Sequence, residues 1–414
     1  MSAARYGWYG DDFTGASDTL ATLAERNLAA LLFLKVPTAS QLERAGPLDA
    51  IGIAGAARSM APEAMTAELE AVGRFFAAAG VQILHYKCCS TFDSAPHVGS
   101  IGVATRALAP HFPNPFVPIL GGQPNLGRFC LFGTLFAAAG DGQIHRIDRH
   151  PTMSIHPVTP MAEADLRRHL ALQGLADLRL VDYRAYGSPL DIPSAPTLLD
   201  VSRAEDLSVI GPLLWAKAGA GPMLAVGASS VAQALATAWT DRRASQQHQK
   251  PPRHDGPVLA LVGSLSPVTR AQVEAAQGYR HLAIDPHRLL QDPDYVPALQ
   301  RQVVDALGLG NVMLVTDPPG ATPVNAGALA SATGQLLGNI LKKARISRLL
   351  IAGGDTSSLA VRSLDMWGLS YIAPLVPGAP LCRAHSDDPS LDGLEITLKG
   401  GQMGPTDFFT LAAR

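Results

Sequence analysis

The stretch Gly10-Asp11-Asp12-Phe13-Thr14-Gly15-Ala16 decides how the rest of the chain is interpreted. It follows a short apolar run, residues 6–9, that we expect to form the first strand. After it, apolar residues recur at spacings of three and four, which predicts a helix. A strand therefore passes through a tight turn into a helix. In open α/β sheets ligands bind at the carboxyl ends of strands, and the free N–H groups at a helix N-terminus favour anions.

The adjacent carboxylates of Asp11 and Asp12 have two interpretations. In the simpler one, Asp11 or Thr14 caps the helix, because side-chain oxygens accept hydrogen bonds from its first free N–H groups. Capping accounts for one residue, but it does not require the pair together with Thr14-Gly15-Ala16. Adjacent side chains point partly to opposite sides of the chain, so we expect one carboxylate to act and the other to orient. We therefore favour a functional role over capping alone.

The composition excludes several classes of protein. The chain has 414 residues, enough for two or three domains, and 47% are hydrophobic, so a large core is available. A net charge of −2 argues against a nucleic-acid partner, and no apolar run approaches the roughly 20 residues of a membrane helix. The N-terminus lacks a signal-peptide pattern, and the four cysteines lack a Cys-x-x-Cys spacing. We expect a reduced, cytoplasmic protein without structural zinc.

The first half of the chain alternates strand and helix patterns. Further strands are expected at residues 30–36, 50–54, 81–86, 116–120 and 222–226. Helices are expected from Pro62 to Gly80 and from Thr159 onward. Such repeats predict a largely parallel sheet, whose strands share one carboxyl edge. The side chains expected to approach one another at this edge are Asp11, Asp12, Arg58, Lys87, Ser90 and Thr91.

A polar, aperiodic segment, residues 241–256, separates the two halves and is expected to be a linker. A second strand–helix series follows, with strands expected at 258–262, 311–316 and 347–352. We therefore predict two α/β domains, residues 1–240 and 257–414, each a largely parallel sheet with flanking helices.

Glycine turns recur in the second half of the chain, at Gly263-Ser264, Gly353-Gly354 and Gly400-Gly401. Backbone N–H groups can approach a polyphosphate closely at such turns, because no Cβ intervenes. The chain has neither a P-loop nor the glycine-rich loop of protein kinases. Three glycine turns in one domain indicate a nucleotide site of another type.

The first half offers charges that suit an acid with hydroxyl groups. Arg58 and Lys87 can hold a carboxylate, and Ser90 and Thr91 supply hydroxyls. A carboxylate beside a substrate hydroxyl is also what phosphoryl transfer uses to accept the proton. Each cation alone is typical of a protein surface, and it is their shared placement at strand ends that indicates a site.

The N-terminal motif, residues 11–16, resembles the Asp-Asp-x-Thr-Gly-Ala signature of the four-carbon acid sugar kinases. The other motifs that follow in that family's order are Lys87 with Ser90-Thr91, Gly263-Ser264, Gly353-Gly354-Asp355-Thr356-Ser357, Pro377-Gly378-Ala379-Pro380 and Lys399-Gly400-Gly401-Gln402-Met403-Gly404. The resemblance covers nearly the whole chain. It implies an N-terminal domain for the acid sugar, a C-terminal domain for ATP, and phosphorylation of a small sugar acid with ATP and Mg²⁺.

The resemblance also implies roles for residues. Asp12 is expected to be the base on the accepting hydroxyl, with Asp11 beside it. Arg58, Lys87, Ser90 and Thr91 are expected to hold the sugar acid. The residues expected along ATP are Ser264, Gly353, Gly354, Asp355, Pro377, Gly378, Ala379, Pro380 and Gly401. No metal ligand is assigned.

Several residues depart from the pattern that the family implies. Where most members read Lys-x-Asp-Ser-Thr-x-Arg-Gly, this chain has Cys89 for the Asp and Asp93 for the Arg. The usual Gly-Gly-Glu-Thr has Asp355 in place of Glu, which is a milder change. Loss of a cation beside the sugar site predicts a substrate other than plain threonate or erythronate. One such branch of the family phosphorylates 3-oxo-isoapionate, a branched sugar acid.

Two other functions stay open. The chain could be a non-catalytic binder of sugar acids or nucleotides, since two-lobed α/β proteins also serve as ligand sensors. It could also be a hydrolase that uses Cys89 or Asp12, although Cys89 has no evident base partner and a buried, inert thiol is the simpler interpretation. We expect a homodimer, the commonest assembly of soluble enzymes, with neither nucleic acid nor membrane as a partner.

Overall fold

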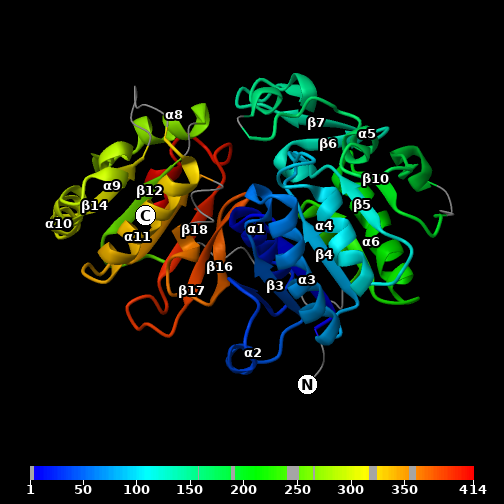
Figure 1. The fold of residues 1–414 in the computed structure, drawn as a ribbon, viewed down its shortest axis with the longest axis horizontal. Coiled ribbons are helices and arrows are strands. Elements are labelled where there is room, and N and C mark those ends of the chain that lie inside the picture. The colour runs from blue at the N-terminus through cyan, green and yellow to red at the C-terminus, as the bar shows by residue number, and fades with distance from the viewer. Residues whose placement is uncertain are drawn as a thin grey trace. The chain divides into compact units, whose positions relative to one another are not determined.

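The computed structural model describes residues 4–156, 158–187, 192–239, 251–263, 266–316, 324–353 and 360–414. The chain divides into two compact units, residues 1–246 and 247–414. Each unit is built from strands with helices packed on them (Figure 1). In the part of the chain that the structure describes, no helix is long and apolar enough to cross a membrane.

The main sheet of the first unit is entirely parallel. Its strand order is β2-β3-β1-β4-β11-β5-β10-β9. The strands are β1 (Tyr6–Gly10), β2 (Ala30–Phe33), β3 (Ala50–Ala54), β4 (Ile83–Lys87), β5 (Pro118–Gly121), β9 (Arg179–Val181), β10 (Thr197–Asp200) and β11 (Met223–Gly227). The chain leaves β1 toward β2 and β3, then crosses to β4 on the other side. The carboxyl end of β1 is therefore a topological switch point, where sheets of this kind bind ligands.

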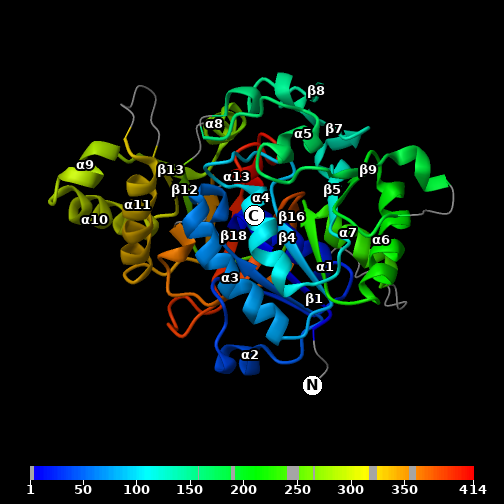
Figure 2. The ribbon, with the colours of Figure 1, turned by 45° about the vertical axis from the view of Figure 1, so that its right-hand side comes forward.

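Helices surround the parallel strands of the first unit (Figure 2). They are α1 (Phe13–Ala24), α2 (Ala39–Ala45), α3 (Pro62–Ala78), α4 (Ile101–Leu108), α5 (Leu166–Ala171), α6 (Ala204–Ala218) and α7 (Ser230–Ala238). α3 packs against α4, whereas α7 packs against both α1 and α6. Right-handed crossovers in opposite directions from the centre place these two groups on opposite faces of the sheet. In α3 an apolar stripe that includes Met65, Leu69 and Phe76 is buried.

An antiparallel sheet of three strands is inserted between β5 and β9. Its strands are β6 (Arg128–Leu131), β7 (Thr134–Ala138) and β8 (Ile144–Arg146). Asp200, at the end of β10, fixes it to the main sheet: the Asp200 carboxylate accepts the N–H groups of Phe132 at 2.5 Å and Gly133 at 2.9 Å, and the Cys130 thiol at 3.3 Å. The sequence patterns did not predict this insertion.

The second unit has a mixed sheet with the order β13-β14-β12-β15-β18-β17-β16. Its strands are β12 (Val258–Val262), β13 (Tyr279–Ala283), β14 (Asn311–Val315), β15 (Arg348–Ala352), β16 (Gly368–Val376), β17 (Ala379–His385) and β18 (Glu395–Lys399). β13, β14, β12, β15 and β18 are parallel, whereas β17 runs antiparallel to both β18 and β16. The three strands expected from the sequence are therefore joined by a hairpin that was not expected.

The helices of the second unit also form two groups. They are α8 (Pro267–Ala275), α9 (Pro286–Gln291), α10 (Tyr295–Leu307), α11 (Ala326–Leu341) and α13 (Phe408–Ala412). α9, α10 and α11 pack together, and α8 packs against α13. Phe408 and Phe409 of α13 belong to the same buried apolar cluster as Val258 of β12 and Leu350 of β15.

The predicted α/β class is confirmed, with flanking helices on largely parallel sheets. The helix expected from Thr159 is wrong, because α5 begins only at Leu166, where Asp165 caps it. The Thr159 hydroxyl instead lies 3.1 Å from His156 Nδ1 and 3.4 Å from the Asp93 carboxylate, so it belongs to a loop. The predicted linker, residues 241–256, lies outside the described residues as far as residue 250.

Candidate active site

The carboxyl ends of β1, β3 and β4 lie level at one edge of the first unit's sheet. Gly10 is in register with both Ala54 and Lys87. Beyond the strands, the Asp11 N–H donates to the Lys87 carbonyl at 2.9 Å, and the Arg58 N–H donates to the Asp11 carbonyl at 3.1 Å. The structure therefore brings together the three segments that were expected to meet.

Arg58 binds both carboxylates of the aspartate pair. Its Nη2 lies 2.7 Å from Asp12 Oδ2 and 3.2 Å from Asp11 Oδ1, and its Nε donates to Asp11 Oδ2 at 3.4 Å. Each aspartate is only 3% exposed. A buried carboxylate is costly unless it is paired and hydrogen-bonded. The Arg58 guanidinium is thus what allows two adjacent carboxylates to stay buried at this strand end.

Asp12 is also the N-cap of α1. Its Oδ1 accepts the Gly15 N–H at 2.5 Å, and its Oδ2 accepts the Thr14 hydroxyl at 3.1 Å. The simpler interpretation named Asp11 or Thr14 as the cap, and this was wrong. Asp12 has the extended backbone conformation that a capping residue needs, directly before the first turn of the helix. One side chain therefore both caps the helix and pairs with Arg58.

The ammonium group of Lys87 is buried beside the aspartate pair. Its Nζ donates to the Cys88 carbonyl at 2.8 Å. Burial lowers the pKa of Lys87, but the charges of Asp11 and Asp12 outweigh this effect, and the net shift of the pKa is upward. Gly15 leaves the space, because a Cβ there would collide with Lys87 Nζ and lie 2.8 Å from Asp12 Oδ1. Lys87 is therefore a fixed positive charge at this edge.

The pKa of Asp11 is raised. Burial is the largest cause, Arg58 opposes it, the Asp12 charge adds to it, and Lys87 opposes it. General base catalysis is most efficient when the pKa of the base approaches the working pH. Asp11 is therefore a second candidate, beside Asp12, for the proton acceptor.

The loop after β4 carries Ser90 and Thr91, and both are nearly buried. The Thr91 hydroxyl donates to Asp93 Oδ1, and Cys89 Sγ lies 2.9 Å from Thr91 Oγ1. Phe92, which lies between Thr91 and Asp93 in the sequence, has φ of +55°, a left-handed conformation that is strained for a bulky side chain. Strained residues of this kind occur often at ligand-binding loops, because the surrounding contacts must hold them.

Sequence reasoning did not select two further polar side chains at this edge. Gln123, one residue beyond the turn that follows β5, donates from Nε2 to Asp18 Oδ2 of α1 at 3.0 Å, and both side chains are buried. Asp18 contributes to the raised pKa of Lys87. The signal that could have found Gln123 is its position two residues after the end of a buried strand.

Arg128, at the start of β6, is a third polar residue that was not selected. Burial lowers the pKa of Arg128, and the nearby groups of Cys89 and Asp93 act in the opposite direction. Its backbone pairs with that of Gln123, whose N–H donates to the Arg128 carbonyl at 2.8 Å. The inserted antiparallel sheet thus brings a cation to the loop in which Asp93 stands where a cation was expected.

Cys89 does not have the properties of a nucleophile. Burial raises the pKa of Cys89 to about 11, and the negative charge of Asp93 adds to the effect. The thiolate is the reactive form of cysteine, so a thiol with this pKa is largely unreactive at neutral pH. The raised pKa of Cys89 therefore argues against a thiol hydrolase. Cys88, Cys89, Cys130 and Cys382 are all free.

In the second unit, the carboxyl ends of β12, β15 and β18 lie side by side. The Gly263 N–H donates to the Ala352 carbonyl at 2.9 Å, and the Gly353 N–H donates to the Lys399 carbonyl at 2.8 Å. Gly353 has φ of +127°, which favours glycine. Gly353 and Gly401 thus follow neighbouring strands at one edge. Three residues that we expected along ATP lie outside the described residues: Ser264, Gly354 and Asp355.

The tetrapeptide Pro377-Gly378-Ala379-Pro380 forms the tight connection between β16 and β17 and the start of β17. Val376 pairs with Ala379 across this turn. Because β17 is antiparallel to β18, with Leu381 opposite Thr397, the turn lies at the edge where β18 ends. A Cβ on Gly404 would lie 3.5 Å from Val376 Cγ2, which places the turn after β18 beside it. The expected nucleotide residues that are described therefore share one edge.

No group of three or more histidine, cysteine, aspartate or glutamate side chains is placed to hold a metal ion in the described part of the chain. The aspartate pair is already engaged with Arg58. Mg²⁺ in kinases is commonly held by substrate phosphates with only one or two carboxylates. The described side chains fit an ion that arrives with a nucleotide and do not fit a cage made by the protein alone.

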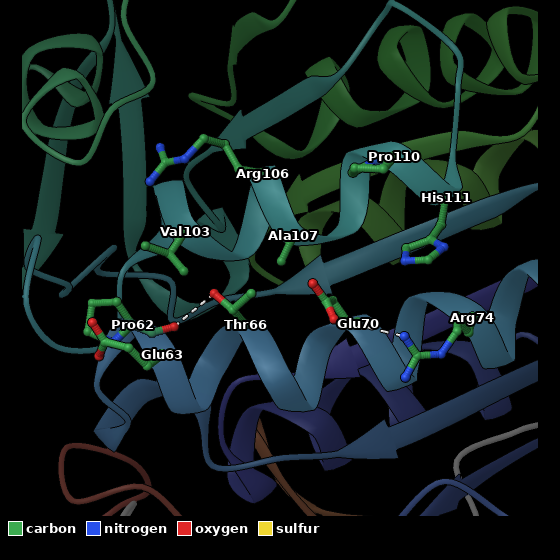
Figure 3. Close-up of a pocket in the computed structure, with 10 residues that line it drawn as sticks. All are labelled: Pro62, Glu63, Thr66, Glu70, Arg74, Val103, Arg106, Ala107, Pro110 and His111. Atoms are coloured by element: carbon green, nitrogen blue, oxygen red, sulfur yellow. Dashed lines mark hydrogen bonds and ion pairs between the residues drawn. The ribbon is translucent and has the colours of Figure 1, made fainter.

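A shallow groove lies elsewhere on the first unit, between α3 and α4 with the turn that follows it (Figure 3). Its volume is about 600 Å³, and its lining includes Glu63, Glu70, Arg74, Arg106 and His111. Glu70 and Arg74 form an exposed pair one helical turn apart on α3. None of the predicted site residues lines this groove, so it is separate from the edge that carries the aspartate pair.

Two family models match the chain. A sugar-binding N-terminal domain matches residues 6–235, and a nucleotide-binding C-terminal domain matches residues 259–409. These matches define a class of two-domain proteins that combine a domain for a sugar with a domain for a nucleotide. The chain belongs to the four-carbon acid sugar kinase family, so the resemblance seen in its motifs is confirmed.

Two curated relatives illustrate the similarity. The 3-oxo-isoapionate kinase of Paraburkholderia graminis is 39% identical over 439 residues, which cover 97% of this chain and 92% of the relative. The 3-oxo-tetronate kinase of Haemophilus influenzae is 29% identical and covers 97% of each chain. Among solved structures, a protein of Salmonella typhimurium LT2 has a TM-score of 0.77 at 26% identity over 100% of this chain and 99% of that one. A protein of Haemophilus influenzae has a TM-score of 0.68 at 26% identity, over 98% of each chain.

Proposed function

We propose that this protein is an ATP-dependent kinase that phosphorylates a hydroxyl group of a small sugar acid or oxo-sugar acid in carbohydrate catabolism. The observation that carries the proposal is the cluster of Asp11, Asp12, Arg58 and Lys87 at the switch point of the first unit. It combines carboxylates that can accept a proton with cations that can hold an acid. The glycine turns at one edge of the second unit supply the kind of backbone that approaches phosphates.

The proposed reaction is an in-line phosphoryl transfer. The accepting hydroxyl oxygen forms a bond to the γ-phosphorus as the bond to the β–γ bridging oxygen breaks, so ADP leaves and the hydroxyl proton passes to a carboxylate. Enzymes of this kind contribute mainly positioning and charge stabilisation. We predict that Asp12 takes the proton, while Arg58, Lys87, Ser90 and Thr91 hold the sugar acid. ATP would bring Mg²⁺, which neutralises charge on the phosphates.

The substrate is proposed to be a branched oxo-sugar acid such as 3-oxo-isoapionate, with 3-oxo-tetronate as the second candidate. The greater identity to the Paraburkholderia graminis relative supports this order. The charges of the site point the same way, because Asp93 accepts hydrogen bonds where a cation was expected. An extra acceptor there suits an extra hydroxyl group better than a second carboxylate.

The direct test is ATP turnover by the purified protein with a panel of four- and five-carbon sugar acids and their 3-oxo derivatives. We expect ADP release that depends on one member of the panel. No turnover with any member, together with a rise in melting temperature on adding a sugar acid but not ATP, would favour the non-catalytic binder. Loss of activity after labelling of Cys89 with a thiol reagent, prevented by substrate, would favour the hydrolase.

Paired variants assign the base. Asp12→Asn is expected to lower kcat by about 10²- to 10⁴-fold, the usual contribution of a general base, with little change in the KM for ATP. Asp11→Asn is the matched variant, because it removes the same charge from the adjacent residue. A larger loss of kcat in Asp11→Asn than in Asp12→Asn would assign the proton to Asp11. Full turnover in both variants would remove the pair from the mechanism.

We further propose a cytoplasmic homodimer. Four free cysteines in the described structure support a reducing compartment. A dimer is the commonest assembly of soluble enzymes. Light scattering coupled to size exclusion should give twice the mass of the 43.4 kDa chain. The mass of a single chain across the concentration range would rule the dimer out.

A further inference from the structure

The inserted antiparallel sheet turns one face toward the carboxyl edge of the first unit's main sheet. Side chains alternate along a strand, so Arg128 and Cys130 of β6 lie on the same face. Cys130 Sγ donates to Asp200 Oδ1 at 3.3 Å, and a Cβ on Gly121 would lie 2.7 Å from the same sulfur. Gly121 ends β5 and Asp200 ends β10. The face that carries Arg128 therefore looks onto the same edge of the sheet as the aspartate pair.

The guanidinium group of Arg128 is partly buried and has few partners. Its Nη1 donates to the Leu126 carbonyl, and its Nε is buried without a hydrogen-bond partner. Among the residues that the structure describes, no carboxylate forms an ion pair with Arg128. A cation that is buried without a counter-ion is unfavourable, and a buried donor without an acceptor adds to the cost. Arg128 therefore has both the charge and the free donors to bind an anionic group.

The two cations that were expected to bind the acid are already balanced by the aspartate pair. Arg58 contacts the carboxylates of both Asp11 and Asp12. The charges of the same two aspartates outweigh the effect of burial on the pKa of Lys87. Two cations thus stand against two carboxylates, and this cluster has no net positive charge left for the carboxylate of a sugar acid. A ligand that is an acid needs a further cation.

Arg128 has the same neighbours as the cations of this cluster. Burial lowers the pKa of both Arg128 and Arg58, and in both residues the groups of Cys89 and Asp93 act in the opposite direction. Burial also lowers the pKa of Lys87, and Cys89 is among the groups that oppose it there. Interactions between charges weaken with distance, so the loop after β4 lies close to all three cations. Arg128 therefore belongs to the same site as the aspartate pair, although it comes from the inserted sheet.

Asp93 does not occupy the donors of Arg128. Its Oδ1 accepts the Thr91 hydroxyl, and its Oδ2 accepts the Thr159 hydroxyl at 3.4 Å. Burial raises the pKa of Asp93, but Arg58 and the Thr91 hydroxyl oppose this effect, and the net shift of the pKa is downward. A second negative charge is disfavoured beside an ionised carboxylate. The acid group of a ligand is therefore expected on the guanidinium of Arg128, with its hydroxyl groups toward Asp93.

We propose that Arg128 binds the carboxylate of the sugar acid, and that through this residue the inserted sheet makes the site selective for acids. This inference rests on the proposed kinase function and deepens it, because it names a residue that selects the class of substrate. A planar guanidinium can donate two parallel hydrogen bonds to the two oxygens of one carboxylate. With the acid group held by Arg128, the aspartate pair stays available to the hydroxyl group that accepts the phosphate.

The test compares two arginines of the inserted sheet, with the best substrate among the sugar acids of the panel. Arg128→Met should raise the KM for the acid about 10- to 100-fold, the usual effect of losing charge-assisted hydrogen bonds, with little change in kcat or in the KM for ATP. Arg146→Met is the control, because Arg146 of β8 is exposed and already pairs with Asp148, and it should change none of these values. Arg128→Lys keeps the charge without the planar fork and should recover part of the loss.

The amide of the same acid separates recognition of the carboxylate from support of the fold, since it has a similar shape and no charge. In calorimetric titration, wild type should bind the acid at least about tenfold more tightly than the amide, and Arg128→Met should bind both alike. A wild-type KM for the acid in Arg128→Met, or an equal loss of affinity for acid and amide in both Arg128→Met and Arg128→Lys, would overturn this role of Arg128.

The titration also distinguishes this inference from the kinase proposal. Binding of the acid that depends on Arg128, without phosphoryl transfer to any member of the panel, would overturn the kinase proposal and leave the role of Arg128 standing. Wild-type protein that binds no acid of the panel would overturn both.

Discussion

At the scale of single residues, Gly15 shows how the absence of a side chain positions a charge. Gly15→Ala would place a methyl group against the Lys87 ammonium and the Asp12 carboxylate. We expect kcat/KM for the sugar acid to fall about 10- to 100-fold, because a displacement of about 1 Å in a site has effects of this size. Steady-state kinetics at saturating ATP measure the change.

Gly327→Ala is the control for this prediction. Gly327 is also in the first turn of a helix, α11, but among the described residues a Cβ there would meet only Asn325 Oδ1 at 3.4 Å. It should leave kcat/KM unchanged and raise stability by up to about 1 kcal/mol through helix propensity. If Gly15→Ala retained the activity of Gly327→Ala, the position of Lys87 would not matter to the reaction.

The lowered pKa of Lys399 predicts how the stability of the protein depends on pH. Its pKa is about 7 in the folded protein and about 10.4 in an unfolded chain. Between these values the unfolded state binds more protons, so this residue makes stability rise with pH, by up to about 1.4 kcal/mol per unit. Urea unfolding at pH 7, 8 and 9 should therefore show wild type gaining stability relative to Lys399→Met. A gap that stays constant or shrinks would mean that Lys399 is charged in the empty protein.

Much of the residue-level chemistry of the first unit could be predicted. Asp11 and Arg58 each follow a strand and Lys87 ends one. Parallel strands bring their carboxyl ends together, so position in the sequence was enough. The hydrogen bonds that hold the turn at residues 400–405 could not be predicted in this way. They depend on how the side chains of Thr269 and Gln272 meet carbonyl groups more than a hundred residues away, and backbone carbonyl directions leave no pattern in the sequence.

At the scale of elements, Asp200 decides whether the inserted antiparallel sheet stays attached. Asp200→Ala would leave the N–H groups of Phe132 and Gly133 without their acceptor, and Gly133 is buried. We expect a loss of about 2–4 kcal/mol in the free energy of unfolding, measured with urea. Asp182→Ala is the control, because Asp182 pairs with an exposed Arg184, and it should cost less than about 1 kcal/mol. Similar losses in both variants would contradict the role of Asp200.

The inserted sheet is also the element of the first unit that sequence reasoning missed, and the pairing of its strands explains why. Its strands are short, and they pair with one another before the chain returns to β9, so they do not repeat the strand–helix pattern that predicted the parallel sheet. The helix expected at Thr159 failed for a related reason. Its proline and glutamate suit a helix start, but the Thr159 hydroxyl is committed to His156 and Asp93. A tertiary contact outweighed a local preference.

At the scale of the whole molecule, the chain should separate into two stable parts. The linker predicted at residues 241–256 contains Arg242, Arg243 and Arg253, which are trypsin sites because none of them is followed by proline. Brief digestion of the native protein should give two fragments that meet in this segment, because folded domains resist cleavage and exposed polar segments do not. Mass spectrometry identifies the ends. First cuts inside either family-matched range, 6–235 or 259–409, would contradict the predicted boundary.

The turn after β18, which we propose to lie along ATP, would offer that ligand main-chain atoms, while the side chains of Lys399, Thr269 and Gln272 contact its carbonyls. A library with every substitution at each position of this turn should therefore show that some positions accept almost any amino acid and others accept very few. Positions 402 and 403 should accept almost every amino acid except proline, which has no N–H and a fixed φ. Position 404 should accept few or none, and the supporting positions 269, 272 and 399 should be as intolerant as any residue that touches the nucleotide. Sequence variability at a binding surface would then be a poor guide to which surface binds.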